Sequence, residues 1–192
     1  MKPISFFLFV SSIFTIFTGI ENGFWRLINE NLFCLQVGLL TLSYQLSQSE
    51  NFTEVFYNRK LFKLFSIMVL LDSLIRLFVD LTLHRESFST IIYYLPNLLT
   101  FCILLFSSKI NPRIHHLLII YPLVNLYFIA SSLYKYYLLI GNPKVVSGDI
   151  VVSTFTIFSI DTLQIVNFNF IRLFLIFYVI KFYKHKITFY GK

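Results

Sequence analysis

The sequence predicts an all-α integral membrane protein whose six helices form a single domain over residues 1–192. Two observations lead to this prediction. Hydrophobic residues make up 57% of the chain and charged residues only 13%, whereas soluble domains contain about 45–50% apolar and about 25% charged residues. The apolar residues are also gathered in segments of about the 20 residues that a helix needs to cross a lipid bilayer.

Six apolar segments predict helices at approximately residues 3–20, 31–47, 61–83, 88–108, 116–140 and 150–180. No small-residue cleavage site accompanies the first segment, which favours a retained helix over a cleaved signal peptide. The last segment contains Asp161 and Arg172, and it is too short for two complete crossings. We interpret it as one span that is either long or broken.

Lysine and arginine residues are distributed unevenly between the loops of this six-span topology. One side of the membrane receives ten of them, namely Lys2, Arg59, Lys60, Lys63, Lys109, Arg113, Lys181, Lys184, Lys186 and Lys192. The other side receives three, namely Arg26, Arg85 and Lys144. Because short loops that are rich in Lys and Arg stay in the cytosol, both termini are predicted to be cytosolic.

The net charge of +7 does not indicate binding to nucleic acid. A nucleic-acid-binding surface concentrates its cations in a patch or stripe, whereas the cations of this chain are scattered singly between apolar segments. The partner that the composition predicts is therefore the lipid bilayer, and no nucleic-acid partner is expected.

Three charged residues lie within the third predicted span. Asp72, Arg76 and Asp80 are spaced at i, i+4 and i+8, so they share one face of a helix and Arg76 can bridge both carboxylates. Because charges inside a bilayer are costly, this polar ladder should face the bundle interior or a wet cavity. The ladder is either the polar lining of a substrate passage or proton relay, or a self-neutralised packing cluster.

The sequence contains no motif that indicates catalysis or a cofactor. It has no Gly-rich phosphate loop, no His-Glu-x-x-His sequence and no nucleophile-elbow serine. His115 and His116 are adjacent, and neighbouring side chains on a helix point about 100° apart, which does not suit a shared metal ion. We expect no enzymatic activity, no metal and no cofactor.

Several short motifs follow one another in a characteristic order. They are Trp25-Arg26 directly after the first apolar segment, a tyrosine, an acidic turn and a basic loop within residues 43–59, Asn111-Pro112 before the fifth segment, and Gly141-Asn142 after it. In this order they resemble the derlin (Der1-like) family, the pseudoprotease branch of the rhomboid superfamily. The resemblance covers roughly residues 23–160.

This resemblance implies a six-helix rhomboid-like bundle in the endoplasmic reticulum membrane, with both ends in the cytosol. The implied function is a part in endoplasmic-reticulum-associated degradation: the protein binds misfolded clients and assists their retrotranslocation to the cytosol by distorting the membrane. Trp25 and Arg26 would anchor the luminal loop. The implied partners are the clients, ubiquitin-ligase and ATPase machinery, or other derlin-like subunits.

Proteolysis is not expected, because the chain lacks the serine and histidine of the rhomboid proteases. No serine lies in a Gly-x-Ser-Gly context, and no histidine lies in the middle of a predicted span. Two other functions remain open. A small transporter or channel subunit would use the ladder of Asp72, Arg76 and Asp80 as its path, and a membrane-shaping or assembly protein of the endoplasmic reticulum would not need it.

Overall fold

The computed structural model describes residues 2–21, 33–82, 89–107, 109, 111–139 and 160–190. These residues form helices and short connections, with no β-strand among them. The α-helices are α1 (Lys2–Glu21), α3 (Phe33–Gln48), α4 (Arg59–Thr82), α5 (Ser89–Leu105), α6 (Ile120–Leu139) and α7 (Ile160–Tyr190), and two 3-10 helices are η1 (Phe52–Phe56) and η2 (Pro112–Ile119). The predicted all-α fold is thus confirmed for this part of the chain.

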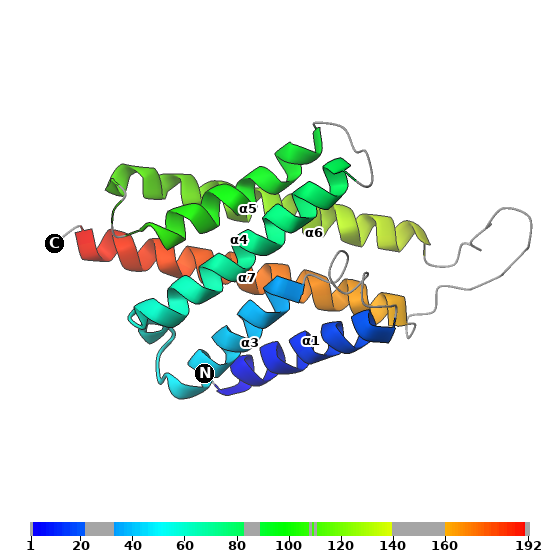
Figure 1. Ribbon diagram of the computed structural model, residues 1–192, viewed down its shortest axis with the longest axis horizontal. Coiled ribbons are helices and arrows are strands. Elements are labelled where there is room, and N and C mark those ends of the chain that lie inside the picture. The colour runs from blue at the N-terminus through cyan, green and yellow to red at the C-terminus, as the bar shows by residue number, and fades with distance from the viewer. Residues whose placement is uncertain are drawn as a thin grey trace, which may run out of the picture.

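The helices are arranged as a bundle in which both termini lie at one end. Helix α1 packs against α3, α3 against α4, α4 against α5, and α6 against α7. The N-terminus of α1 and the C-terminus of α7 are on the same side of the molecule as η1 and the connection from α5 to η2 (Figure 1). We refer to this side as the terminal end of the bundle.

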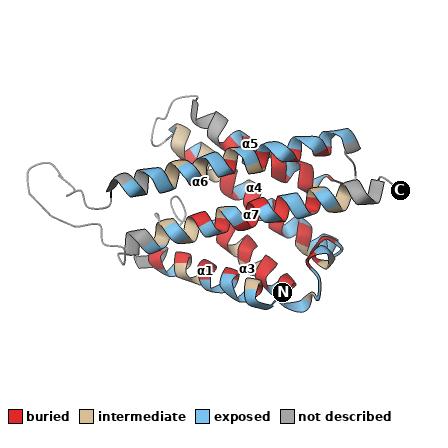
Figure 2. Ribbon diagram, turned by 180° about the vertical axis from the view of Figure 1, so that it is seen from behind, coloured by how far each residue is buried: buried red, intermediate tan, exposed pale blue. Residues whose placement is uncertain are grey.

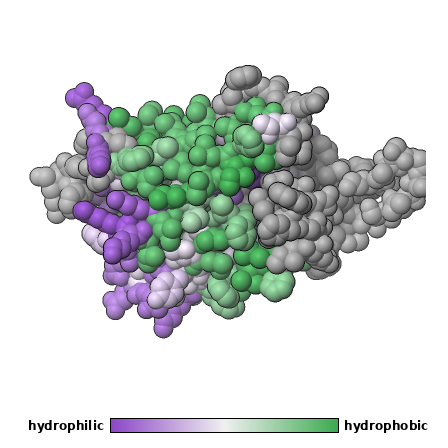
Figure 3. Space-filling view, in the orientation of Figure 1, coloured by the Kyte–Doolittle hydropathy of each residue, from purple (hydrophilic) through white to green (hydrophobic). Residues whose placement is uncertain are grey.

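Among the described residues, the outer surface of the bundle is largely apolar and hydrophilic side chains gather at the terminal end. Buried residues face inward and exposed residues face outward on each helix (Figure 2). Many outward side chains are large and hydrophobic, including Phe17, Phe78 and Tyr127, which are 69%, 67% and 69% exposed. Figure 3 shows hydrophobic residues across the middle of the visible face and hydrophilic residues at the terminal end.

Helices of membrane-spanning length and composition are present in the described part of the chain. The segments Arg113–Tyr134 and Leu163–Lys186 are long and apolar enough to cross a bilayer, and Lys2–Thr18 and Tyr94–Leu105 are shorter apolar helices. An exposed apolar surface of this extent marks a site of contact with membrane or protein. These features support association with a membrane.

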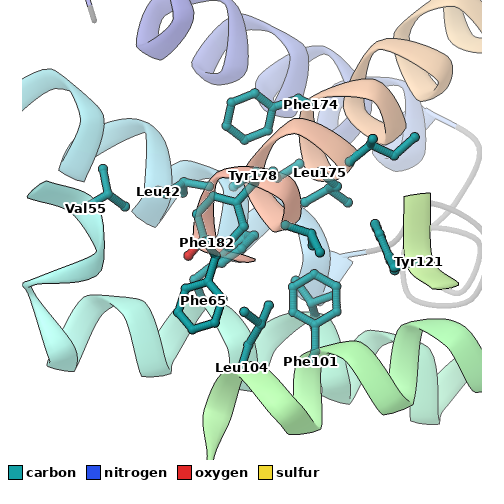
Figure 4. Packing of buried hydrophobic residues seen from close by; sticks show 14 of the residues in the cluster. Leu42, Val55, Phe65, Phe101, Leu104, Tyr121, Phe174, Leu175, Tyr178 and Phe182 are labelled. Carbon is teal, nitrogen blue, oxygen red and sulfur yellow. The ribbon is translucent and has the colours of Figure 1, made fainter. Parts of the chain in front are cut away.

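Aromatic side chains around α7 form the centre of the core. Tyr178 and Phe182 are one helical turn apart and point toward α4 and α5 (Figure 4). The ring centroids of Tyr178 and Phe65 are 5.0 Å apart, and those of Phe182 and Phe62 are 5.3 Å apart. Such edge and stacked contacts add to the stabilisation from burial. The i, i+4 spacing on α7 is therefore what joins it to α4.

Hydroxyl and amide side chains join α1 to its neighbours. Ser5 and Ser43 each donate a hydrogen bond to the other's backbone carbonyl, both at 2.7 Å. On α7, Asn167 donates to Thr15 Oγ1 at 2.8 Å and accepts from Ser11 at 2.5 Å. Small polar residues of this kind let helices approach closely and bond to each other in membranes.

Two helix boundaries differ from the prediction. Helix α7 (Ile160–Tyr190) ends at Tyr190 rather than near residue 180, and it is continuous through Arg172. The prediction ended where the segment stops being apolar, but helical hydrogen bonding continues into the Lys-rich residues. The fifth predicted helix, 116–140, begins as a 3-10 helix, since η2 extends to Ile119 before α6 starts. Residues 150–159 lie outside the described part of the chain.

Candidate functional site

A polar cavity of about 300 Å³ lies between α4, α5, α6 and α7. It extends from the middle of the bundle away from the terminal end, because it is lined by the second half of α4 and the first half of α7. Its polar lining consists of Asp72, Ser73, Arg76, Tyr94, Asn97, Tyr121, Asn125, Ser132, Asn169 and Arg172. We call this feature the polar cavity.

Helical periodicity brings these side chains to one place. On α6, the lining residues Tyr121, Asn125, Phe128 and Ser132 are spaced by four, three and four positions, which is the repeat of a single helix face. Asn169 and Arg172 on α7, three positions apart, share a face in the same way. Each helix therefore turns one polar stripe toward the cavity and an apolar surface outward.

Asp72 is buried, with 6% of its surface exposed, and it connects two helices. Its Oδ1 accepts a hydrogen bond from the backbone N–H of Leu35 at 3.3 Å, in the first turn of α3. Its Oδ2 lies 3.9 Å from Nε of Arg76. The first N–H groups of a helix lack partners within the helix and favour a negative charge, so Asp72 stabilises the start of α3.

Asp80 does not line the polar cavity. Its Oδ2 accepts a hydrogen bond from the hydroxyl of Tyr94 at 2.5 Å, and Tyr94 lies on α5. The ladder predicted from the sequence is therefore divided in the structure: Asp72 connects α4 to α3, and Asp80 connects α4 to α5. Arg76 lines the cavity between them.

Among the described residues that line the polar cavity, cationic side chains outnumber carboxylates. Two guanidinium groups, of Arg76 and Arg172, and one carboxylate, of Asp72, are among its lining residues. Arg172 also lies over the ring of Phe128, at 6.0 Å from the centroid, a distance at which a cation interacts with an aromatic face. The described lining of the cavity is therefore suited to a polar group.

The amides of the polar cavity retain capacity for hydrogen bonding. Asn169 is 6% exposed, and its Nδ2 donates to Ser132 Oγ at 3.4 Å. Its Oδ1 has no hydrogen-bond partner among the described residues. Asn125 donates from Nδ2 to the backbone carbonyl of Tyr121 at 3.0 Å. A buried acceptor without a partner costs free energy, and a guest molecule that donates a hydrogen bond would remove this cost.

Other predicted site residues have structural positions or lie outside the described residues. Asn111 precedes η2, and its side chain accepts a hydrogen bond from the backbone N–H of Arg113 at 3.0 Å. Pro112 is the first residue of η2, a position where its missing N–H has no cost. The remaining predicted residues are outside the described part of the chain, namely Trp25, Arg26, Gly141 and Asn142.

The described residues contain no cluster of metal-ligating side chains. No group of three or more His, Cys, Asp or Glu side chains lies together there as in a metal site. The side chain of His116 contacts the hydroxyl of Tyr183, with Nδ1 at 2.9 Å, while His115 is buried beside Phe182. The adjacent histidines thus point to different surroundings.

Most residues of the polar cavity could not be identified from the sequence. Asp72, Arg76 and Arg172 were recognised as charges within apolar segments, but the roles of Tyr94, Asn125 and Asn169 were missed. A usable signal is present: amides such as Asn125 and Asn169 lie within apolar segments, where an amide that faces lipid would be costly. No family model matches this chain, and no curated protein or solved structure is significantly similar to it.

Proposed function

We propose that this protein is a derlin-like component of endoplasmic-reticulum-associated degradation. In this proposal it crosses the endoplasmic reticulum membrane six times, has both termini in the cytosol, and helps misfolded proteins to leave for the cytosol without catalysis. The order of motifs from Trp25-Arg26 to Gly141-Asn142 supports the family. The polar cavity inside a bundle with an apolar surface is the observation that supports the function.

The polar cavity would give a polypeptide the polar contacts that lipid cannot provide. Because both termini are cytosolic in this proposal, the terminal end of the bundle faces the cytosol. The polar cavity then lies in the luminal half of the membrane. An unfolded segment in hydrocarbon must satisfy its backbone N–H and C=O groups. The guanidinium groups of Arg76 and Arg172 can donate to its carbonyls, and Oδ1 of Asn169 can accept from its N–H groups.

Short helices support the membrane-distorting part of the proposal. Helices α3 and α5 have 16 and 17 residues, which correspond to about 24–26 Å at about 1.5 Å per residue. A typical hydrocarbon core is about 30 Å thick. A bilayer thins locally around helices that are too short, and thinning shortens the apolar distance that a client must cross.

The decay of a misfolded luminal reporter tests this function. In cells that lack the gene, a plasmid copy of the wild type should restore rapid decay, whereas Asn125→Leu should leave decay as slow as in the deletion. The leucine side chain has the same number of heavy atoms and the same branching as asparagine, but it removes a polar group from the cavity. Tyr127→Leu, on the outer face of the same helix, is the matched control and should restore decay fully.

Two results would reject the proposal. One is decay that is unchanged by deletion of the gene. The other is equal rescue by Asn125→Leu and Tyr127→Leu at matched protein levels, which would show that the polar cavity has no part in the process.

A double substitution of Trp25 and Arg26 by alanine should also slow decay, because these residues would anchor the luminal loop.

The charge of the polar cavity favours a second candidate, a small transporter or channel subunit. Arg76, Arg172 and Asp72 line the same volume, as in a path for a small ion or a polar substrate. Purified protein in liposomes would then conduct a flux of that ion or substrate, and Asp72→Asn would abolish it. Such a flux, together with reporter decay that does not depend on the gene, would replace degradation by transport as the function.

A further inference from the structure

A second, smaller cavity of about 160 Å³ lies at the terminal end of the bundle. It is formed where the start of α4, the end of α5 and the last turns of α7 meet. Its basic side chains are Arg59, Lys63, His185 and Lys186. We call this feature the basic pocket, and its position coincides with the hydrophilic end of the molecule in Figure 3.

Among the described residues that line the basic pocket, none is Asp or Glu. Arg59, Lys63 and Lys186 place three cationic side chains around it. The nearby Glu54 accepts a hydrogen bond from the backbone N–H of Glu50 at 2.9 Å, within its own turn. Three permanent cations around one cavity favour an anionic occupant.

Part of the wall of the basic pocket is aromatic. Phe56 and Phe62 pack on Phe182, with ring centroids 5.4 and 5.3 Å from it, and all three line the pocket. The ammonium group of Lys186 lies 5.7 Å from the centroid of the Phe182 ring. The pocket thus joins an apolar wall to a cationic one, at the boundary between the apolar surface of the bundle and its charged end.

We propose that the basic pocket binds the phosphate-bearing headgroup of an anionic membrane phospholipid. Arg59, Lys63 and Lys186 would contact the phosphate through charge-assisted hydrogen bonds, and the acyl chains would lie along the apolar outer surface. Basic pockets between helices on the cytosolic side of membranes are suited to such headgroups. The proposal requires only that the bundle lies in a membrane, and it does not depend on the passage of clients.

The apolar wall distinguishes a lipid from free phosphate as the occupant. Inorganic phosphate would use only the cations of Arg59, Lys63 and Lys186, and it would gain nothing from the aromatic wall. An amphiphile would use both walls, and its headgroup would stay at the level of the membrane surface. The two sources of phosphate therefore differ in how strongly each can compete for the pocket.

Retention of lipid by the purified full-length chain tests the proposal. The protein, reconstituted in phosphatidylcholine with a minor fraction of labelled phosphatidylinositol or phosphatidic acid, is extracted into detergent and washed at physiological salt. The wild type should retain the labelled anionic lipid. The triple variant Arg59→Gln, Lys63→Gln and Lys186→Gln should retain about a hundredfold less, because each basic residue near the surface contributes about one tenfold step in affinity or slightly less.

A second triple variant is the matched control. Lys60→Gln, Lys181→Gln and Lys184→Gln remove the same charge from the same two helices, at positions that do not line the basic pocket, and should keep the lipid bound. Equal retention by the two triple variants, or equal loss, would overturn the proposal, since the pocket would then have no specific role. Displacement of the lipid by millimolar inorganic phosphate would also overturn it in favour of a phosphate site.

Folding of the variants is tested independently of binding. Each should elute as a single species and unfold at the temperature of the wild type. If the pocket triple variant fails this test, the single variant Lys63→Gln takes its place, because Lys63 is exposed near the start of α4. Lys63→Arg keeps the charge and should keep the lipid, so retention by Lys63→Arg with loss by Lys63→Gln supports the proposal. Retention by both would contradict it.

Discussion

Asp72 is a buried carboxylate at which α3 and α4 meet. It accepts the N–H of Leu35 and lies beside Arg76, so that the same side chain stabilises a helix start and lines the polar cavity. Asp72 therefore fits both interpretations of the charged ladder, as a packing cluster and as a polar lining. It has a packing role, and its charge contributes to the cavity. Substitutions that separate charge from hydrogen bonding can distinguish the two roles.

We expect Asp72→Leu to lower the free energy of unfolding by about 3 kcal/mol, because it removes both the acceptor for Leu35 and the carboxylate beside Arg76. Asp72→Asn should cost about 1 kcal/mol, since its amide oxygen can still accept the hydrogen bond from Leu35. Denaturant unfolding in detergent micelles measures both values. Equal losses for the two variants would contradict the role of the hydrogen bond, and Leu74→Ala on the exposed face serves as control.

At the scale of single residues, the sequence indicated which charges avoid lipid but not what they contact. The i, i+4 spacing of Asp72 and Arg76 was enough to place both on one helix face. The hydrogen bond from Tyr94 to Asp80 and the one from Leu35 to Asp72 join different helices. They depend on how the helices are rotated and paired, which no spacing within one segment determines.

At the scale of helices, α3 and α4 approach closely at Gly38. A Cβ atom at this position would lie 3.1 Å from Cβ of Met68 and 3.3 Å from Cδ2 of Phe65. Glycine fits at this contact, whereas any larger residue would require α4 to shift slightly. Because α3 and α4 pack closely, Asp72 and the N-terminus of α3 both lie at the polar cavity.

We expect Gly38→Leu to destabilise the bundle by about 1–3 kcal/mol through overpacking against α4. Gly38→Ala should have a smaller effect, because alanine gains about 1 kcal/mol in helix propensity against the crowding at Met68. Thermal unfolding in micelles measures the difference. Tyr44→Leu, an exposed position on the same helix, should be near neutral; a neutral Gly38→Leu would show that the two helices are not in close contact.

The existence of the helices and most of their ends could be predicted from the sequence, whereas the end of α7 and the kind of helix at η2 could not. Each predicted apolar segment corresponds to a helix in the structure, because length and composition determine which segments become helical. The end of α7 at Tyr190 was missed, since Lys and Tyr residues after position 180 continue a helix without being apolar. The 3-10 geometry of η2 follows Asn111-Pro112, a signal for a helix start that does not specify which kind of helix begins.

At the scale of the whole molecule, the bundle and the charge distribution agree in one respect. Both ends of the described chain lie at the terminal end (Figure 1), which is the arrangement that the count of Lys and Arg residues requires. Asn51-Phe52-Thr53, a sequence that fits the N-glycosylation pattern, lies in the connection between α3 and α4 at this end. Its state of glycosylation therefore reports the orientation of the bundle.

We expect no glycan on Asn51, because the terminal end is proposed to be cytosolic. Glycosidase treatment should leave the mobility of the wild type unchanged. As a positive control, the pair Gly148→Asn and Ile150→Thr creates an acceptor site between α6 and α7, which should receive a glycan in the lumen. A glycosidase-dependent shift that Asn51→Gln abolishes would reverse the proposed topology.

The central claim is that the polar cavity contacts a misfolded client during its passage. Photocrosslinking with benzoylphenylalanine tests it most directly: the probe replaces either Phe128, which lines the cavity, or its neighbour Tyr127, which is 69% exposed on the outer face. We predict a crosslink between position 128 and the misfolded reporter, and a much weaker one from position 127. Crosslinks of equal yield from both positions, or none from position 128 while the reporter is being degraded, would contradict the account.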